Sequence, residues 1–167
     1  SREGKLLGSS YELAAFAAEM KAEMVMFMAG SETELPKLDT TVYLADAAVV
    51  GEYNPDLHRR LIVEVAEKEN VDAVVFCHSS YGWDLAPRVA YGLGAAQITE
   101  VVEVAGGELV VPVCNAKLRR EVTGSTPRKV ITIQAGAFGL ADEPQGSPAL
   151  EKLEVASEGR VEFLGYE

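Results

Sequence analysis

Apolar residues recur with a helical period in two segments of the chain. The first is 9–22, "SSYELAAFAAEMKA", where either serine at the start is suited to cap a helix and Glu12 falls in its first turn. Its predicted inner face consists of Leu13, Phe16, Ala17 and Met20. The pattern predicts an amphipathic helix.

A second helix is predicted from Asn54, because Asn54 is a good cap and Pro55 suits the first helical position. The segment "NPDLHRRLIVEVAEKEN" carries an apolar stripe and an opposite charged face. The stripe is Leu57, Leu61, Val65 and Ala66, and the predicted solvent face is Arg59, Arg60, Glu64, Glu67 and Lys68.

Three apolar runs without helical periodicity predict strands: 23–30, which ends at Gly30, then 40–46 and 71–80. The last, "VDAVVFCHSS", has no alternation of apolar and polar residues, so we expect it to be covered on both faces. After Gly94 the chain becomes rich in short strands, and the pair Gly106-Gly107 indicates a hairpin. The predicted later strands lie in 97–104, 109–122 and 128–138, with a loop over 140–149 and one or two final strands in 150–157 and 160–167.

This order of elements predicts an α/β fold: a three-layer sandwich with a mainly parallel sheet and extra C-terminal antiparallel strands. We expect one domain over 1–167, with a core of about 5–138 and a loop with terminal strands over 139–167. Such a domain normally begins with a strand, yet this chain begins where that strand would end. Either the opening strand is missing, or a strand from elsewhere fills its place.

Composition narrows the class of function. The net charge of −11 repels both the phosphate backbone of nucleic acids and anionic lipid surfaces, so we expect neither as a partner. The apolar runs are shorter than the roughly 20 residues of a membrane-spanning helix, and the first residues lack a secretory signal pattern. We therefore expect a cytoplasmic protein.

Cysteines and histidines do not form a recognisable catalytic or metal site. Cys77 and Cys114 are expected to be free, buried thiols. Adjacent residues on a strand point to opposite faces, so His78 is not a ready base for Cys77, and it is expected to be hydrogen-bonded or to face solvent. His58, beside two arginines, is expected on the surface. A zinc site and an enzyme mechanism are therefore not predicted, and no acid/base pair of carboxylates is visible.

The corner "CHSSYGWDLAPRVAYGLG", residues 77–94, is the candidate ligand site, because ligands gather at the carboxyl ends of parallel strands. Ser79 and Ser80 offer hydroxyl groups, Gly82 allows close approach, and the next helix offers free N–H groups. Arg88 completes a candidate nucleotide-binding set.

The alternative is a simple capped turn, with Asp84 as N-cap, Pro87 as third helical residue and Trp83 packed on neighbours. The segment has no glycine-rich phosphate motif, so chemistry alone leaves both readings open.

A basic cluster stands out in the acidic chain: Lys117, Arg119, Arg120, Arg128 and Lys129. On a β-ribbon it would suit an acidic partner. Equally, it would protect an exposed sheet edge from aggregation.

Taken together, residues 51–104, 111–122 ("VPVCNAKLRREV") and 130–138 ("VITIQAGAF") resemble the N-terminal domain of the electron transfer flavoprotein alpha subunit. The family's helix motif G-x-D-L-A-P-R matches Gly82 to Arg88. The chain departs from the family where Y-A-G-N-A becomes "PVCNA" at 112–116 and where R-P-G-A-F becomes "QAGAF" at 134–138.

The resemblance implies an adenine nucleotide alpha-hydrolase-like (Rossmann-like) fold, a beta-subunit partner, and electron transfer between dehydrogenases and an acceptor. It implies FAD in the complete protein, held chiefly by a C-terminal domain absent from this chain, so no cofactor is expected here. Trp83, Lys117, Arg119 and Arg120 would then be partner-interface residues. The alternative is a stand-alone adenine-nucleotide-binding module using the corner at 79–88.

Overall fold

The computed structural model describes residues 5–51, 53–140, 144–155 and 164. It contains three main helices, the short helix α2, and nine strands within those residues. The helices are α1 (Ser10–Glu19), α2 (Ala47–Val50), α3 (Pro55–Lys68) and α4 (Ser80–Leu93). The strands are β1 (Val25–Gly30), β2 (Thr41–Asp46), β3 (Ala73–Cys77), β4 (Ala96–Val101), β5 (Glu103–Ala105), β6 (Glu108–Val113), β7 (Leu118–Val122), β8 (Lys129–Ile133) and β9 (Ala149–Lys152).

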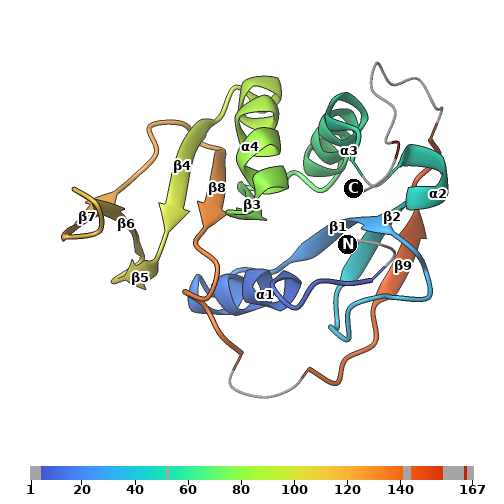
Figure 1. Cartoon of the computed structure of the whole chain (residues 1–167), viewed down its shortest axis with the longest axis horizontal. Coiled ribbons are helices and arrows are strands. Elements are labelled where there is room, and N and C mark those ends of the chain that lie inside the picture. The colour runs from blue at the N-terminus through green and yellow to red at the C-terminus, as the bar shows by residue number, and fades with distance from the viewer. Residues whose placement is uncertain (1–4, 52, 141–143, 156–163, 165–167) are drawn as a thin grey trace.

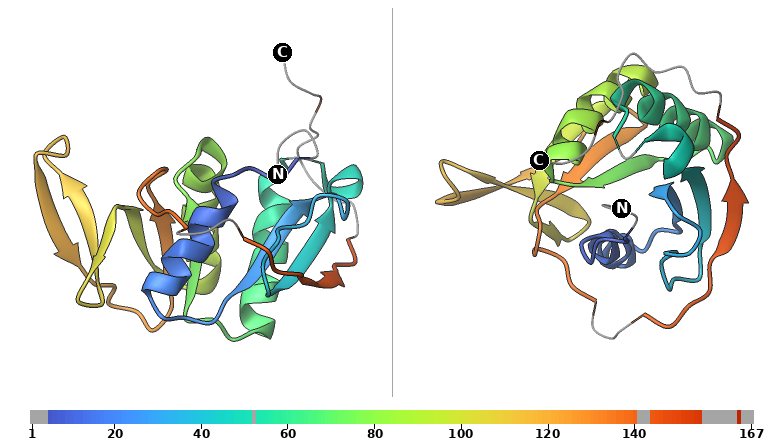
Figure 2. Two further views of the ribbon diagram at one scale, coloured as in Figure 1. Left: turned by 90° about the horizontal axis from the view of Figure 1, so that it is seen from below. Right: turned by 45° about the vertical axis from the view of Figure 1, so that its right-hand side comes forward.

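The strands form three sheets, of which two are parallel. Their orders are β1-β2-β9, β3-β8-β4 and β5-β6-β7, and only the last is antiparallel. In the right-hand view of Figure 2, α3 and α4 lie on one side of the parallel strands and α1 lies on the other, while Figure 1 shows β5 to β7 projecting to the left as an arm. The three-layer α/β sandwich predicted from the sequence is confirmed.

β8 shows why the layers hold together. Val130 packs with Leu85, Val89 and other residues of α4, whereas Ile131 and Ile133 pack with Phe16 of α1. This alternation follows from the two-residue period of a strand, which sends successive side chains to opposite faces. On the α1 side, Phe16 meets Phe138 edge to face, with ring centroids 5.2 Å apart.

The antiparallel extension is confirmed but shorter than the sequence indicated. It comprises β5 to β7, with Gly106 and Gly107 both at positive φ in the turn between β5 and β6. β8 and β9 return to the parallel sheets, where β8 inserts between β3 and β4 and β9 pairs with β2. Most of the predicted strand in 160–167 lies outside the described residues.

One expectation about β3 and α4 was confirmed and one was wrong. β3 is covered on both faces as predicted, because Val74 and Phe76 pack on the α3–α4 side and Ala73 and Val75 on the α1 side, although its five residues remain half-buried. α4 begins at Ser80 with Ser79 as N-cap, so Asp84 is not the cap and Pro87 lies inside the helix. The cap at Ser79 and the burial of Leu85 and Ala86 stabilise the longer helix by more than it loses through the one backbone hydrogen bond that Pro87 cannot form.

Candidate functional site

The corner between β3 and α4 is a tightly packed helix entrance. The Ser79 hydroxyl accepts a hydrogen bond from the Gly82 backbone N–H at 3.2 Å. A Cβ atom at Gly82 would lie 2.0 Å from the carbonyl oxygen of Cys77, so only glycine lets the first turn of α4 rest on the end of β3. Gly82 therefore serves packing inside the chain.

A tyrosine, an aspartate and an arginine close the outer side of this corner. The Tyr53 hydroxyl donates a hydrogen bond to Asp84, and Arg88 donates to both oxygens of the same carboxylate, at 3.1 and 3.2 Å. Arg88 also approaches Asp56 at 3.8 Å. The hydrogen bond from Tyr53, followed by those from Arg88, lowers the pKa of Asp84, whereas burial is the main reason that the pKa of Tyr53 is raised.

Beneath this group lies His58, which is buried at 3% exposure and not on the surface as the sequence suggested. Its ring packs edge-on against Phe27 and Tyr53, and its Nε2 atom has no hydrogen-bond partner in the described part of the chain. Burial lowers the pKa of His58 to about 4, so the ring is neutral at physiological pH. Tyr53 in turn stacks on Tyr81, with centroids 4.4 Å apart.

The predicted nucleotide-binding residues come together, but most are engaged by the chain itself. Ser79 caps the helix, Gly82 is buried against Cys77, and Arg88 holds two carboxylates. Ser80 is exposed. Nucleotide binding at this corner stays a prediction, which calorimetric titration with AMP, ATP and FAD would test.

Sequence reasoning missed Tyr53 as part of this corner, and it assigned no contact to Tyr81, which lies within the segment 77–94. Tyr53 immediately precedes the cap of α3, and nothing in the local pattern shows that this cap lies beside the start of α4. The sequence does place one tyrosine next to the start of each of these two helices. A tyrosine near a helix start is too common, however, to predict that the two side chains contact each other.

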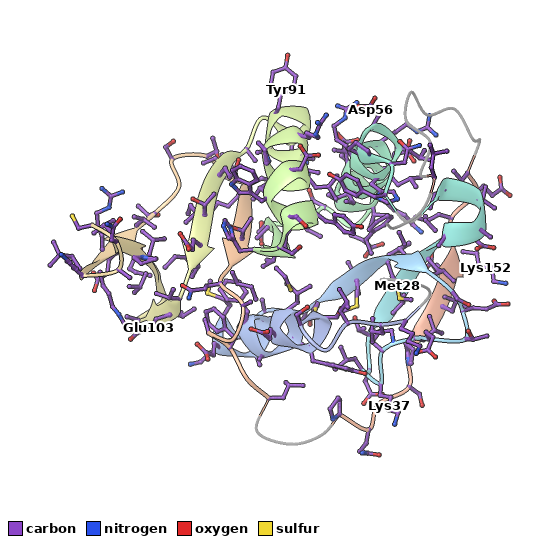
Figure 3. The ribbon with its side chains drawn as sticks, in the orientation of Figure 1. Met28, Lys37, Asp56, Tyr91, Glu103 and Lys152 are labelled. Carbon is purple, nitrogen blue, oxygen red and sulfur yellow. The ribbon has the colours of Figure 1, made fainter. Side chains whose placement is uncertain are left out.

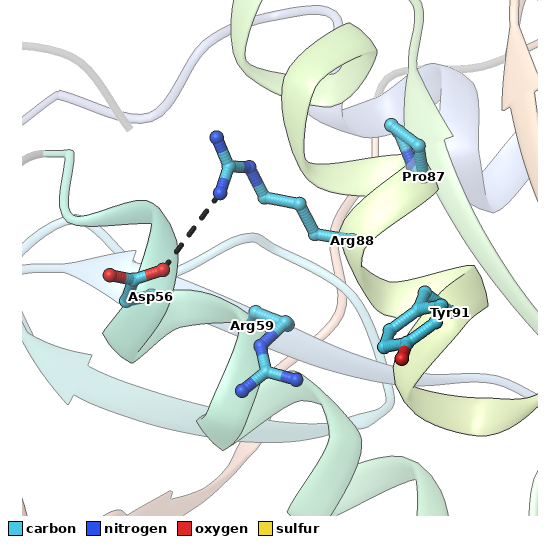
Figure 4. Close-up of a pocket in the computed structure, with 5 residues that line it drawn as sticks. All are labelled: Asp56, Arg59, Pro87, Arg88 and Tyr91. Atoms are coloured by element: carbon cyan, nitrogen blue, oxygen red, sulfur yellow. Dashed lines mark ion pairs between the residues drawn. The ribbon is translucent and has the colours of Figure 1, made fainter.

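The outward face of α4 carries an apolar stripe, formed by Trp83, Pro87 and Tyr91 at i, i+4 and i+8. Trp83 is 67% exposed and Tyr91 is 88% exposed, so the expectation that Trp83 packs on neighbours was wrong. Figure 4 shows Pro87 and Tyr91 beside Arg59, Arg88 and Asp56, which together line a shallow pocket of about 400 Å³ between α3 and α4.

The arm presents part of the basic cluster. Lys117, Arg119 and Arg120 lie on or next to the exposed strand β7, and Arg119 pairs with Glu103 of β5. Within the described residues, Lys117 and Arg120 form no ion pair. Arg128 and Lys129 are not part of this surface, because Arg128 bonds to Asn70 at the end of α3 and Lys129 begins β8.

The cysteines and the second histidine have ordinary surroundings. Both thiols are free as predicted, but Cys114 is exposed, not buried, and Cys77 is half-buried with its Sγ donating to the Ser9 carbonyl at 3.0 Å. Burial raises the pKa of Cys77, which disfavours its reactive thiolate. His78 Nδ1 lies 2.9 Å from the Thr132 hydroxyl, so this histidine is hydrogen-bonded, as expected.

The described residues contain neither a metal-binding cluster nor a membrane-spanning helix. No three or more His, Cys, Asp or Glu side chains are grouped so that they would hold a metal ion. In the same part of the chain, every helix is too short or too polar to cross a bilayer.

Comparison with known proteins identifies the family of the chain, which the geometry alone does not. Residues 1–158 match the model of the electron transfer flavoprotein domain. The chain belongs to the electron transfer flavoprotein family. The three relatives described next are named as alpha subunits, and together with the family match they support an alpha-type N-terminal domain.

Three relatives show how much of an alpha subunit is represented. The electron transfer flavoprotein subunit alpha of Bacillus subtilis is 24% identical over 93% of this chain and 52% of its own length. The alpha subunit of Pseudomonas aeruginosa is 30% identical over 75% of this chain and 41% of its own length. A probable mitochondrial alpha subunit of Cryptococcus neoformans is 23% identical over 92% of this chain and 48% of its own length. The chain thus spans about half the length of the electron transfer flavoprotein subunits it matches.

Proposed function

We propose that residues 1–167 act as a scaffold and docking domain of an electron transfer flavoprotein alpha subunit. In this role the domain binds the beta subunit and helps to place dehydrogenases and an acceptor, while FAD is held by polypeptide outside this range. The observation that carries the proposal is the match of residues 1–158 to the family.

The contacts at the corner support a scaffold role. Asp84, Arg88 and Ser79 have the chemistry of a ligand site, yet their polar atoms bond to one another and to Tyr53 and Gly82. A ligand would have to displace these internal hydrogen bonds, each of which contributes on the order of 1 kcal/mol. The corner therefore favours a rigid support over a cofactor cradle.

Two exposed surfaces support the docking role. The stripe on α4 joins two aromatic side chains with the nearby Arg59, and aromatic residues and arginine are the residue types that dominate protein interfaces. The arm places Lys117 and Arg120 on a projecting edge of a chain whose net charge is −11, so their field favours an acidic partner.

Co-expression with the beta subunit from the same organism tests docking. We expect the complete alpha polypeptide to form a one-to-one complex, detected by gel filtration with light scattering. The double variant Lys117→Glu/Arg120→Glu should weaken association about tenfold or more, with a lower salt dependence. Trp83→Ala should weaken it by slower association or faster dissociation if the α4 stripe is part of the interface.

Lys37→Glu is the matched control for the single variants Lys117→Glu and Arg120→Glu, because each of the three exchanges one positive side chain for one negative side chain. Lys37 is exposed, and Figure 3 places it at the bottom right, far from Glu103 of the arm. If Lys37→Glu weakened association with the beta subunit as much as the arm variants do, the effect would come from net charge alone, and docking at the arm would be contradicted.

Visible absorbance tests the assignment of the flavin. Purified residues 1–167 should be colourless after desalting. FAD bound to this chain at one-to-one stoichiometry would contradict the proposal.

A further inference from the structure

The face formed by α3 and α4 is a surface separate from the arm. Trp83, Pro87 and Tyr91 of α4 are all exposed and follow one another along one side of the helix. In Figure 3, Tyr91 points outward at the top of the molecule, whereas Glu103 of the arm lies at the lower left. A partner can therefore cover the α3–α4 face without touching the arm.

Arg59 gives this face a cation that no described residue pairs. Its guanidinium reaches across from α3 to α4, where its Nη1 lies 3.7 Å from the position of a Cβ atom built on Gly92. Among the described residues, Arg59 has no ion-pair partner. Arg88 differs, because Asp84 and Asp56 both face it. The N–H groups of Arg59 are thus available to a carboxylate of another molecule.

The packing of the two helices places Arg59 beside the apolar stripe. A Cβ atom at Gly92 would lie 3.1 Å from Val63 of α3, so the glycine allows α3 and α4 to approach closely. Arg59, Pro87 and Tyr91 line the same shallow pocket, and Figure 4 shows Arg59 between the helices with Tyr91 next to it. The pocket therefore fits an acidic side chain that has apolar neighbours.

The size of the face favours a transient partner. The stripe from Trp83 to Tyr91 is about 12 Å long at the helical rise of 1.5 Å per residue. Its two aromatic side chains bury at most about 500 Å² when they are fully covered. A stable interface buries about 800 Å² on each partner, and smaller ones are typical of electron-transfer encounters. A second copy of the chain is disfavoured, because each copy has a net charge of −11.

We propose that the α3–α4 face binds an acidic segment of a transient redox partner, with a carboxylate on Arg59 and an apolar side chain against Pro87 and Tyr91. This inference rests on the proposed function, in which the transient partners of the domain are proteins that exchange electrons with the flavoprotein. The contact holds the partner and takes no part in the electron transfer itself. Weakening it therefore raises KM for the partner and leaves kcat unchanged.

Steady-state electron transfer by the complete alpha–beta complex tests the contact. The complex is assayed with each dehydrogenase and acceptor of the same organism that exchanges electrons with it. For one of these partners, Arg59→Gln and Tyr91→Ser should each raise KM about fivefold to tenfold, with kcat unchanged. KM should also rise with salt concentration, and less steeply in Arg59→Gln. An unchanged KM for every partner in both variants would overturn the proposal.

Two further variants are controls. Arg60→Gln removes the same charge from the next residue of α3, which does not line the pocket, and Val49→Ser removes exposed apolar surface from α2. Both should leave KM unchanged, and a rise equal to that of Arg59→Gln would overturn the proposal. Failure of the unmodified complex to form or to exchange electrons would contradict the proposed function, and this inference with it.

The fluorine NMR signal of Trp83 locates the partner. The complex is prepared with fluorinated tryptophan, and the signal is identified by its absence from the Trp83→Phe variant. The partner found by kinetics should shift this signal, and Arg59→Gln should need about fivefold to tenfold more partner for the same shift. A signal that does not respond to the partner overturns the proposal.

The same signal distinguishes the other occupants of the face. A change in the Trp83 signal when the complex alone is diluted would assign the face to a second copy. A change when the beta subunit is added to the alpha polypeptide, together with weaker binding of that subunit by Trp83→Ala, would assign the face to the beta subunit. Either result overturns the proposal.

Discussion

The corner at α4 and the β5–β7 arm contain similar residue types but use them in opposite ways. At the corner, Arg88 is bound by Asp84 and Asp56, and the Tyr53 hydroxyl completes the group. On the arm, Lys117 and Arg120 form no ion pair with any described residue. Polar composition therefore does not locate a binding surface by itself, because what matters is which groups the fold leaves unpaired.

The largest predicted effect tests whether the corner is closed by backbone contact. Gly82→Val should destabilise the protein by about 3 kcal/mol or more, because the new side chain would overlap the Cys77 carbonyl. Urea denaturation measures the change. Gly139→Ala is the control, since nothing lies within 4 Å of a Cβ there. Equal stabilities of the two variants would show that the corner is open enough to admit a ligand.

The next effect concerns the buried imidazole under the corner. Because the folded pKa of His58 is about 4 and the ordinary value is 6.5, the unfolded chain binds the proton first as pH falls. The stability contributed by the neutral ring is present above about pH 6.5 and is lost progressively towards pH 4. When the pH falls from 7 to 5, the free energy of unfolding should decrease by about 2 kcal/mol more in the unmodified protein than in the His58→Leu variant. Parallel stability profiles of the two proteins over this range would contradict the buried, neutral state.

A smaller effect is expected from the hydrogen bond between Tyr53 and Asp84. Tyr53→Phe should cost about 1 kcal/mol at pH 7, since the carboxylate keeps Arg88 and is partly open to water. The folded pKa of Asp84 is depressed, so its contribution is present above its usual pKa and is lost below it, and the variant should lose less stability on acidification. Thermal unfolding at a series of pH values from 7 to 3 measures both the stability and its loss on acidification. Tyr91→Phe, on the exposed stripe, should change neither the stability at pH 7 nor its dependence on pH.

The smallest effect tests the tip of the arm. Cys114, Asn115 and Ala116 all have φ between 54° and 60°, the left-handed region that favours glycine. The family pattern has glycine at the position of Cys114, so Cys114→Gly should stabilise the protein by about 0.5 to 1 kcal/mol. Chemical denaturation checks this value, and Cys77→Ala is the comparison for loss of a thiol without relief of backbone strain. A destabilised Cys114→Gly variant would show that the cysteine side chain supports the arm.

Local signals predicted most helices and strands. Asn54 accepts a hydrogen bond from the Leu57 N–H and Pro55 begins α3, as the sequence indicated, because caps act through residues within one turn. The glycine pair placed the β5–β6 hairpin for the same reason. α4 was predicted to begin too late because Pro87 is an equally local signal, and a tertiary contact with β3 outweighed it.

The candidate site was less predictable than the fold. The residues of the corner were identified, but their partners were not, since Tyr53 and Asp84 are far apart in sequence. The error on His58 has the same origin, because two neighbouring arginines indicate an exposed turn, while its contact with Phe27 arises only when α3 packs on β1.

The sequence by itself determined the element types, the α/β layering and the family, because periodicity, capping and motif order are recorded within short stretches of chain. Only the tertiary structure decided which polar groups are hydrogen-bonded within the chain and which cations of the basic cluster lie together on the arm. These are properties of distances between remote segments, and a local pattern contains no measure of such distances.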